Sequence, residues 1–275
     1  MIACRLFVFV ALVRFVGSSR VVSTPFGRYE MRDCRACALN DVRLPSAHAC
    51  AVPFASWWPG DATQSPAPES IEHLVVAVAG GGQRAENVHD FVHRLFEADA
   101  WSGARIVVLA PMLPLLCESD DLSPAATTLA DSAFAAAMLP EFCTVMALRF
   151  GTSGCHFVGL SNGGIASLQM VLRRAAPVDA LSLTLFASAV LDERDVAAVA
   201  RPGNPLCSVP LTTFVGTRDV PFFEAARDMH AALASACGAS QHSRTLVELA
   251  QVHHWNIVEA ASEQFRGTPW TETPN

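Results

Sequence analysis

The stretch CHFVGLSNGGI, residues 155–165, decides the fold more than any other part of this chain. Its first six residues form the kind of short apolar run that predicts a buried strand, and apolar residues recur at helical spacing from Ile165 onward. The pattern Gly-x-Ser-x-Gly around Ser161 falls between the two. A strand-to-helix turn this tight forces the serine into a strained backbone conformation with an exposed hydroxyl, and it needs glycines on both sides to avoid collisions. The alternative interpretation is a Gly-Ser turn that only caps a helix.

Short apolar runs alternate with segments of helical periodicity on both sides of this turn. The runs predict strands at His73–Ala79, Ala104–Leu109, Cys155–Leu160, Leu181–Ala187, Leu211–Val215 and Thr245–Leu249. Helical spacing appears between or after them at residues 88–96, 165–172, 222–233 and 257–261. Such alternation is typical of a mostly parallel sheet with helices on both faces, so the predicted fold class is α/β. Residues 188–210 are too few for a large helical cap, and the apolar run 112–116 is a possible lining of an acyl pocket.

A serine hydroxyl needs a base to take its proton, and that base needs a carboxylate to orient it. Asp219 lies in GTRDVP just after one predicted strand, and His254 lies in HHW just after the next. Because the carboxyl ends of parallel strands meet at one edge of a sheet, we expect Ser161, Asp219 and His254 to lie together there. His253 is the alternative base, since either histidine of the pair could face the serine.

Other ionisable residues have ordinary structural interpretations. Asp192 and Asp195 also follow a predicted strand and are the rival carboxylates, but we expect Asp192 to cap a helix or to pair with an arginine. Glu248 is expected to point outward from its strand. His73 and His156 are expected to be core or surface groups rather than catalytic ones.

Four motifs together resemble those of the α/β-hydrolase superfamily, serine esterase and lipase type: Gly80-Gly81-Gly82, GLSNGG, GTRDVP and HHW. GLSNGG is also similar, more narrowly, to the turn of polyhydroxybutyrate depolymerases and feruloyl esterases. The resemblance covers about residues 71–265 and implies an α/β-hydrolase fold that cleaves carboxylic esters through an acyl-enzyme. It also implies an oxyanion hole formed by the amide of Asn162 and by Gly81 or Gly82. Ala79 departs from the family pattern, because it stands where an HGGG-type motif has histidine.

The resemblance leaves the substrate open. An ester hydrolase with a small or extended substrate is the main prediction, because a small or absent cap favours an open cleft. A peptidase, amidase or thioesterase with the same three residues is one alternative, and a hydrolase-fold binding protein without activity is another. The predicted chemistry requires no cofactor and no metal. The sequence does not predict an oligomeric state.

The first 70 residues lie outside this pattern. Residues 1–19 combine a basic residue, an apolar run too short to span a bilayer and small residues at a possible cleavage position. They predict a signal peptide, and hence a secreted protein or one in the secretory lumen; a cytoplasmic location is the alternative. Residues 20–70 are rich in proline and cysteine and predict an irregular arm, with Trp57 and Trp58 packed against the catalytic domain, residues 71–275.

The chain has nine cysteines, of which Cys4 lies in the predicted signal peptide. The remaining eight are an even number, which permits disulfides in an exported protein but does not fix their pairing. Possible metal ligands near the N-terminus are Cys34, Cys37, His48 and Cys50. Their spacing fits no standard zinc finger, so a local disulfide is favoured over zinc. Cys143 and Cys155 lie in apolar surroundings and are expected in the core.

Composition narrows the function classes. Hydrophobic residues make up 51% of the chain, which excludes a disordered protein. The formal net charge is -7 and no basic stretch occurs, so a nucleic-acid partner is not expected. All 19 basic residues are arginine, which excludes a lysine Schiff base and a Walker-type phosphate lysine.

Overall fold

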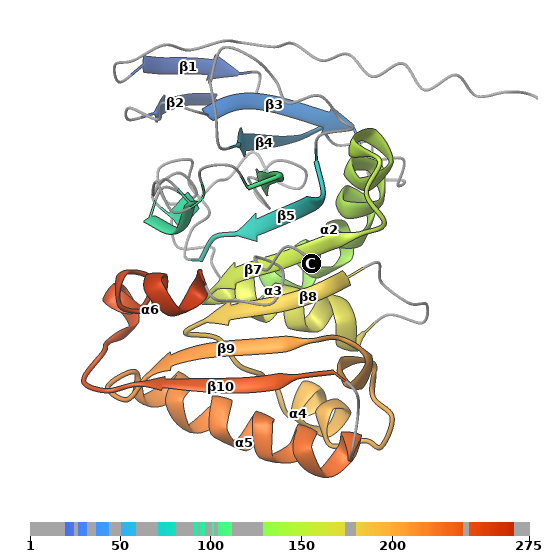
Figure 1. Cartoon of the computed structure of the whole chain (residues 1–275), viewed down its shortest axis with the longest axis vertical. Helices are drawn as coiled ribbons and strands as arrows, with labels where there is room; N and C mark the ends of the chain where they lie inside the picture. Colours follow the sequence, from blue (N-terminus) through green and yellow to red (C-terminus); the bar gives the residue numbers. More distant parts are fainter. Residues whose placement is uncertain are drawn as a thin grey trace, which may run out of the picture.

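Eight strands form one twisted sheet in this protein (Figure 1). The computed structural model describes residues 51–58, 71–80, 91–92, 94–96, 101, 104–111, 129–173, 180–238 and 242–266, together with the backbone of strands 20–24, 27–31 and 37–43. The order across the sheet is β10-β9-β8-β7-β5-β6-β4-β3. The strands are β3 (Cys37–Arg43), β4 (Ala51–Trp57), β5 (His73–Val78), β6 (Ile106–Pro111), β7 (Cys155–Leu160), β8 (Ala180–Phe186), β9 (Leu211–Gly216) and β10 (Arg244–Leu249).

The six strands from β5 to β10 are mutually parallel, which confirms the predicted mostly parallel sheet. All six lie where apolar runs predicted them, with ends that differ by two residues or fewer. β5, β6 and β7 are buried on both faces and read as continuous apolar runs, which explains why their prediction succeeded. The α/β fold class is therefore confirmed.

The N-terminal arm is less irregular than predicted. β3 and β4 pair antiparallel with each other, and β4 pairs antiparallel with β6, so both belong to the main sheet. Pairing of β4 with β6 begins at Phe54, one residue after Pro53, so the missing proline N–H falls outside that ladder. Two further strands, β1 (Arg20–Thr24) and β2 (Gly27–Met31), form a separate antiparallel pair. The predicted signal peptide, residues 1–19, lies outside the described residues.

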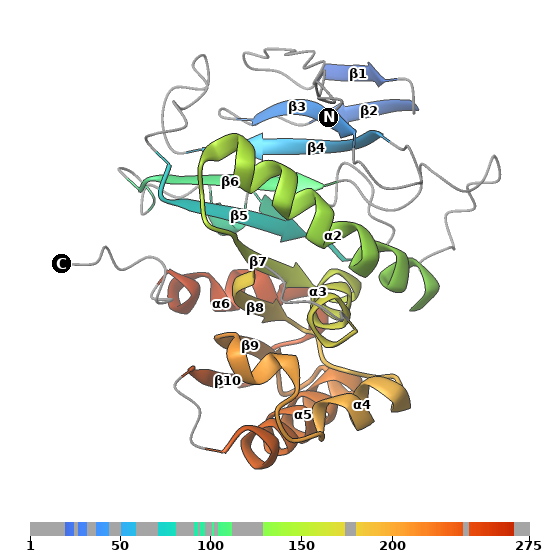
Figure 2. The same cartoon turned by 90° about the vertical axis from the view of Figure 1, so that its right-hand side faces the viewer.

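Side chains alternate between the two faces of the sheet and build two cores. Along β5, Leu74, Val76 and Val78 belong to one apolar cluster, while Val75 and Ala77 belong to the other. The first cluster includes side chains of α2 (Leu129–Phe150), α3 (Asn162–Leu172), α4 (Glu193–Val199) and α5 (Val220–Cys237). The second includes the helical residues Phe91, Val92, Leu95 and Phe96 and side chains of α6 (Ile257–Phe265), so helices cover both faces as predicted (Figure 2).

Trp57 ends β4, Trp58 follows it, and the two side chains pack into opposite faces of the sheet. Both indoles are buried, Trp57 in the cluster that holds α6 and Trp58 in the cluster that holds α2. The prediction that they pack the arm on the domain is confirmed.

The chain reverses its direction across the sheet between β5 and β7. From β5 it moves to β6 with the helical residues 91–92 and 94–96 on one face. From β7 it moves the other way through β8, β9 and β10 with helices on the opposite face. Right-handed crossovers require this change of face when the direction reverses. The loops after β5 and β7 therefore diverge at a topological switch point, where open α/β sheets bind their ligands.

Helix α2 was not predicted. It runs through Pro140, which lacks the N–H that a helix interior uses and which reads in the sequence as a breaker. Burial of one face against α3 and β5 stabilises it, and Cys143 in its second half forms a disulfide with Cys155 of β7. These two cysteines lie in the core as expected, but they are not free thiols. The run 112–116 lies outside the described residues.

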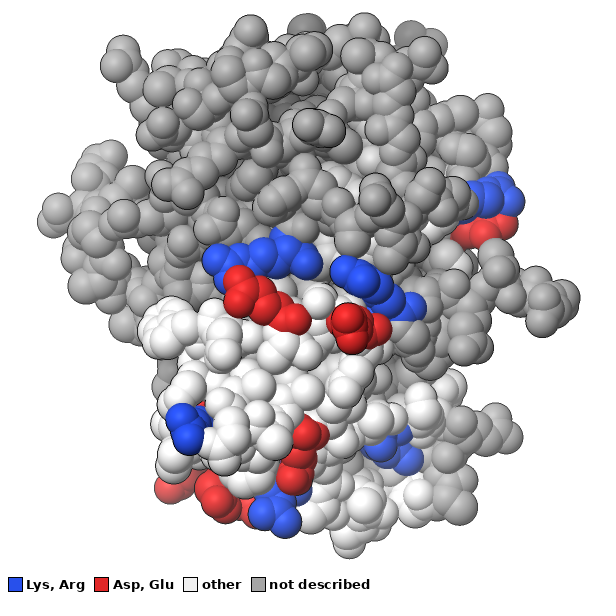
Figure 3. Space-filling model, turned by 60° about the vertical axis from the view of Figure 1, so that its left-hand side comes forward, with Lys and Arg blue, Asp and Glu red and all other residues white. Residues whose placement is uncertain are grey.

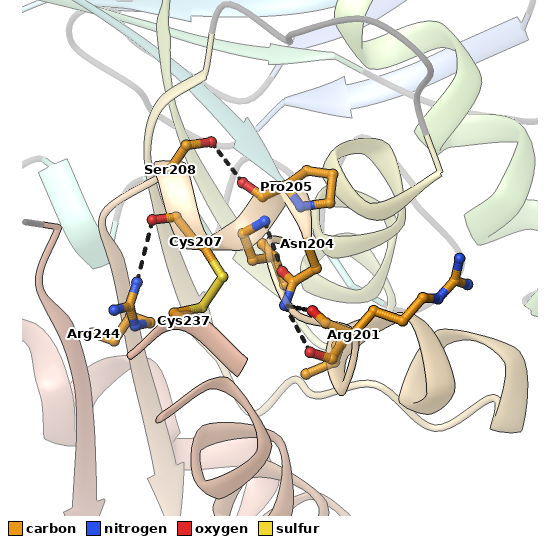
Figure 4. The surroundings of a disulfide bond; sticks show 9 residues. Arg201, Asn204, Pro205, Cys207, Ser208, Cys237 and Arg244 are labelled. Atoms are coloured by element: carbon orange, nitrogen blue, oxygen red, sulfur yellow. Dashed lines mark hydrogen bonds between the residues drawn. A yellow bond between two sulfur atoms is a disulfide. The ribbon is translucent and has the colours of Figure 1, made fainter. Parts of the chain in front are cut away.

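A second disulfide joins Cys207 to Cys237 at the far end of α5 (Figure 4). Cys207 lies in a 3-10 turn, Pro205–Ser208, that begins at the buried Asn204. The Asn204 side chain donates to the carbonyl of Val199 and accepts from the amide of Leu206, so the turn is fixed on both sides. The other predicted cysteine and zinc ligand positions lie outside the residues whose side chains are described.

Several charged side chains of the described residues form ion pairs. On the side of the molecule that carries α6 in Figure 1, arginines lie beside acidic residues (Figure 3). Arg94 on the segment 91–96 bonds Glu259 of α6 at 3.0 Å, and Arg227 of α5 lies 3.4 Å from Glu248, which points outward as predicted. Within the described part of the chain, no helix has the length and apolar character needed to cross a bilayer.

Candidate active site

Ser161 occupies the turn between β7 and α3 in a strained conformation. Its φ is 51° and its ψ is -121°, in the region that favours glycine. The turn closes only because its neighbours are glycines. A Cβ on Gly159 would lie 2.5 Å from the Cα of Gly164, and one on Gly163 would lie 2.1 Å from the carbonyl oxygen of Val78. The predicted serine turn is thus the tight, strained one that the glycine pattern indicates.

Hydrogen bonds hold the Ser161 backbone in this conformation. Its N–H donates to the carbonyl of Phe186 at 2.9 Å. Its carbonyl accepts from the N–H of Ile165 at 3.0 Å and from the hydroxyl of Ser188 at 2.9 Å. The strained residue is therefore tied both to its own helix and to the loop that follows β8.

Asp219 and His254 meet just beyond the carboxyl ends of β9 and β10, and Ser161 likewise follows the carboxyl end of β7. Nδ1 of His254 lies 2.7 Å from Oδ2 of Asp219, a short and charge-assisted contact. The carboxylate side chain is 6% exposed and the imidazole 22% exposed. With Nδ1 bonded to an acceptor carboxylate, Nε2 carries the lone pair and can accept a proton.

The two loops that carry these residues are bonded to each other. The amide of Thr217 donates to the carbonyl of Leu249, the amide of Arg218 donates to that of Val252, and the hydroxyl of Thr217 accepts from the amide of Gln251. Gly216 permits this approach, because a Cβ there would lie 2.2 Å from the carbonyl oxygen of Val252. The geometry of the Asp219–His254 contact is therefore set by the backbone.

Asp219 departs from the usual behaviour of an aspartate at its position. It is the residue before the first turn of α5, where an aspartate side chain normally accepts from a backbone N–H of that turn and stabilises the helix by about 1 kcal/mol. Its side chain makes no such bond. The carboxylate is turned toward His254 instead, which indicates that this contact takes precedence over capping.

The adjacent histidines lie in different surroundings. His254 stacks on Phe222 with ring centroids 5.2 Å apart and planes at 27°, and its edge meets the ring of Trp255. His253 is exposed, and its Nε2 lies 3.5 Å from the guanidinium of Arg218. The structure thus brings His254, and not His253, to the carboxylate.

The glycine-rich loop after β5 begins beside Ser161. A Cβ on Gly80 would lie 2.7 Å from the carbonyl oxygen of Leu160 and 2.8 Å from the Cβ of Ser161. Gly81 and Gly82, the predicted oxyanion glycines, lie outside the described residues. Asn162, the other predicted donor, is the first residue of α3, so its amide lies at the positive end of that helix.

Solved structures of known proteins share this architecture. A thermophilic esterase from the planctomycete Thermogutta terrifontis, solved with butyrate bound, superposes with a TM-score of 0.57 at 16% identity, covering 86% of this chain and 96% of that one. A predicted CIB-like hydrolase from Thermoplasma acidophilum gives a TM-score of 0.54 at 14% identity, covering 84% of this chain and 96% of that one. The chain has the α/β-hydrolase fold. The predicted resemblance is therefore confirmed for the fold.

A peptidase shares the hydrolase fold as well. Porphyromonas gingivalis dipeptidyl peptidase 4 gives a TM-score of 0.59 at 11% identity, over 84% of this chain and 35% of that one. No protein-family model matches the sequence, and no curated protein is similar to it at the sequence level.

The rival carboxylates of this hydrolase fold have structural partners. Asp192 accepts from the amide of Arg194 and caps α4, as expected. Asp195 is buried and forms two hydrogen bonds with Arg173, the residue that caps the C-terminus of α3, at 2.9 and 2.7 Å, and one with Gln169 of α3. Asp195 therefore attaches α4 to α3, and Asp192 caps α4 and lies 3.8 Å from the same Arg173 guanidinium. Among the described residues, no group of three or more histidines, cysteines and acids could hold a metal ion.

Two residues at the site were not found from the sequence. Ser188 bonds the Ser161 carbonyl and Phe222 stacks on His254, and each lies a few residues past the carboxyl end of a strand. Their position after a strand is the sequence feature that could have pointed to them, since the segments that follow the carboxyl ends of parallel strands carry the site in α/β sheets. The sequence alone does not indicate which side chain in each loop turns inward.

Proposed function

We propose that this protein is a serine hydrolase that cleaves carboxylic esters, with Ser161 as nucleophile, His254 as base and Asp219 as the carboxylate that orients the base. The 2.7 Å contact between His254 and Asp219, in loops that end at the same sheet edge as the strained Ser161, carries the proposal. The chain order Ser, Asp, His is that expected of a nucleophile on an α/β-hydrolase turn.

In the first half-reaction, the Oγ of Ser161 attacks the ester carbonyl carbon, its proton passes to Nε2 of His254, and the carbonyl electron pair moves onto oxygen. When the tetrahedral intermediate collapses, the bond to the alcohol oxygen breaks and the alcohol leaves with the proton from Nε2. Water then attacks the acyl-enzyme by the same route, with His254 again taking and returning the proton. Asp219 stabilises the imidazolium that forms in each step.

The negative oxygen of the tetrahedral intermediate needs N–H donors that are already in place. We propose the amide of Asn162 as one donor, since it follows the nucleophile at the start of α3. Gly81 or Gly82 supplies the other, because their loop begins at Gly80, in contact with the turn at Ser161.

Esters are favoured over amides as substrates. The Thermogutta terrifontis esterase, which matches over nearly its whole length, has butyrate bound, so a short acyl group is the first substrate class to test. A peptidase or amidase is the second candidate, because dipeptidyl peptidase 4 shares the fold. Thioester hydrolysis uses the same chemistry, and a binding protein without activity is the remaining alternative.

A substrate panel separates these candidates. The purified protein is assayed against p-nitrophenyl esters of graded acyl length, an acyl thioester and peptide anilides, with Ser161→Ala as the blank. We expect turnover of the short-chain esters that disappears in Ser161→Ala. Turnover of the anilides alone would transfer the proposal to a peptidase, and no turnover of any substrate by a folded protein would favour the binding protein.

We also propose that the protein is exported. Two disulfides, Cys143–Cys155 and Cys207–Cys237, support this, because disulfides persist in oxidising compartments and are rare in a reducing cytosol. Fractionation of cells that produce the full chain tests it. The protein should be found outside the cytoplasm with residues 1–19 removed.

A further inference from the structure

The backbone carbonyl of Ser161 is held from two sides. The N–H of Ile165 donates to it at 3.0 Å, as the first hydrogen bond of α3, and the Oγ of Ser188 lies 2.9 Å away. The two carbonyls share the single proton of this hydroxyl, since the same Oγ lies 2.8 Å from the carbonyl of Phe186, which itself accepts from the N–H of Ser161. The loop after β8 therefore anchors the peptide groups on both sides of Ser161.

Anchoring this carbonyl also fixes the direction of the Asn162 N–H. A peptide unit is planar and trans, so the carbonyl of Ser161 and the N–H of Asn162 point in opposite directions within one rigid group. Rotation about ψ of Ser161, which is -121°, turns both together. Because Ser161 is in a strained region of φ/ψ space, the surrounding contacts are what keep this unit in place.

The Ser188 hydroxyl is built into the turn. Ser188 is 0% exposed, and a Cβ on Gly164 would lie 2.1 Å from its Oγ. The last glycine of GLSNGG, Gly164, thus leaves the space that this hydroxyl fills. Complete burial keeps Ser188 away from solvent and substrate, so it acts only through the residues it bonds.

We propose that Ser188 is a positioning residue, which holds the Ser161–Asn162 peptide unit so that the Asn162 N–H is aligned for the negative oxygen of the intermediate. This inference rests on the proposed function of Ser161 and Asn162. An oxyanion donor acts mainly in the transition state, so its misalignment lowers kcat and leaves KM largely unchanged.

Ser188→Ala removes one of the two anchors and leaves the bond from Ile165. Loss of a whole oxyanion donor lowers kcat by about 10²- to 10³-fold, so partial misalignment should lower it by about tenfold. KM should change by less than about twofold. Affinity for a boronic acid, which becomes a tetrahedral adduct on the serine, should fall in parallel with kcat because that adduct also needs the donor.

Ser167→Ala is a matched control. Ser167 is also 0% exposed, and its hydroxyl also donates to a backbone carbonyl at 2.9 Å, but that carbonyl belongs to Gly163 within α3. The same atoms are removed at the same burial, with no bond to the Ser161–Asn162 unit. This variant should lose a similar amount of thermal stability and keep kcat within about twofold of the wild type.

The experiment measures kcat, KM and n-butylboronic acid affinity for the wild type, Ser188→Ala and Ser167→Ala with p-nitrophenyl butyrate. A fall in kcat and boronate affinity confined to Ser188→Ala supports the proposal. Equal kcat values in the two variants would overturn the positioning role while leaving the hydrolase intact. A wild type that neither turns over esters nor binds the boronate would overturn the proposed function and this inference together.

If Ser188→Ala does not fold, Ser188→Cys replaces it. The thiol is a weaker hydrogen-bond donor of similar shape. Ser188→Cys should lower kcat by less than complete loss of the hydroxyl donor would, with KM unchanged. A kcat equal to that of the wild type would overturn the proposal.

Discussion

The stability of this protein should fall steeply below neutral pH because of a buried histidine. His156 is the second residue of β7 and is 6% exposed. It lies at the amino end of this strand, whereas Ser161 follows the carboxyl end. Its Nδ1 lies 2.9 Å from the Ser182 hydroxyl and its Nε2 lies 3.2 Å from Nδ1 of His73. Burial, and secondarily the neighbouring His73, lower the pKa of His156 to about 3.

The sign and size of the effect follow from linkage. The unfolded chain protonates this histidine near its ordinary pKa of 6.5, whereas the folded chain does so only near 3. Between these values the unfolded state binds more protons, so the free energy of unfolding decreases as the pH falls. From pH 7 to pH 5, His156 alone should lower it by about 2 kcal/mol. Burial lowers the pKa of His73 and of His230 too, and their contributions have the same sign.

Urea unfolding at pH 7 and pH 5, followed by tryptophan fluorescence, measures this difference in the wild type and in His156→Gln. Glutamine keeps hydrogen-bonding groups at the site but does not titrate, so the loss of stability between the two pH values should shrink by about 2 kcal/mol. His253→Gln, which removes an exposed imidazole, should leave the loss at its wild-type size. If His156→Gln loses as much stability between pH 7 and pH 5 as the wild type does, the assignment of this loss to His156 is wrong.

Two further predictions concern the buried ion pair and the two histidines. Arg173→Ala removes the guanidinium that pairs with the buried Asp195 carboxylate and should lower the free energy of unfolding by about 2 to 3 kcal/mol, whereas the exposed Arg201→Ala should change it by less than about 0.5 kcal/mol. Equal effects of the two substitutions in a denaturant titration would contradict the assigned burial of this ion pair. His254→Ala should lower kcat for an ester by about 10³-fold or more, and His253→Ala by less than about tenfold, because only His254 contacts Asp219. The opposite ranking would transfer the role of base to His253.

The parallel strands and the serine turn could be read from the sequence because local chemistry determines them. Continuous apolar runs mark strands that are buried on both faces, and the glycines around Ser161 mark a turn that no other residue fits. Prolines were less reliable signals. Pro53 lies in β4 at a position outside the ladder with β6, and α2 continues through Pro140 because packing against α3 outweighs the lost hydrogen bond.

The sequence favoured His254 over His253 only through the helical spacing that begins after Trp255, because the outcome depends on how one short loop turns. In the structure the N–H of His253 donates to the side chain of Asn256, and this bond caps the 3-10 turn His254–Asn256. His254, the first residue of that turn, contacts Asp219. Ser188 could not be found for a similar reason. Its role depends on contacts with Ser161 across 27 residues of chain, and no local pattern indicates those contacts.

The central claim is that Ser161 is an activated nucleophile, and its covalent labelling tests this most directly. The full chain is treated with a fluorophosphonate, and the modified peptide is identified by mass spectrometry, alongside a folded Ser161→Ala variant. We expect one label per molecule on Ser161, with none on the variant. A folded wild type that is not labelled, or a variant that still takes up the label, would contradict the claim.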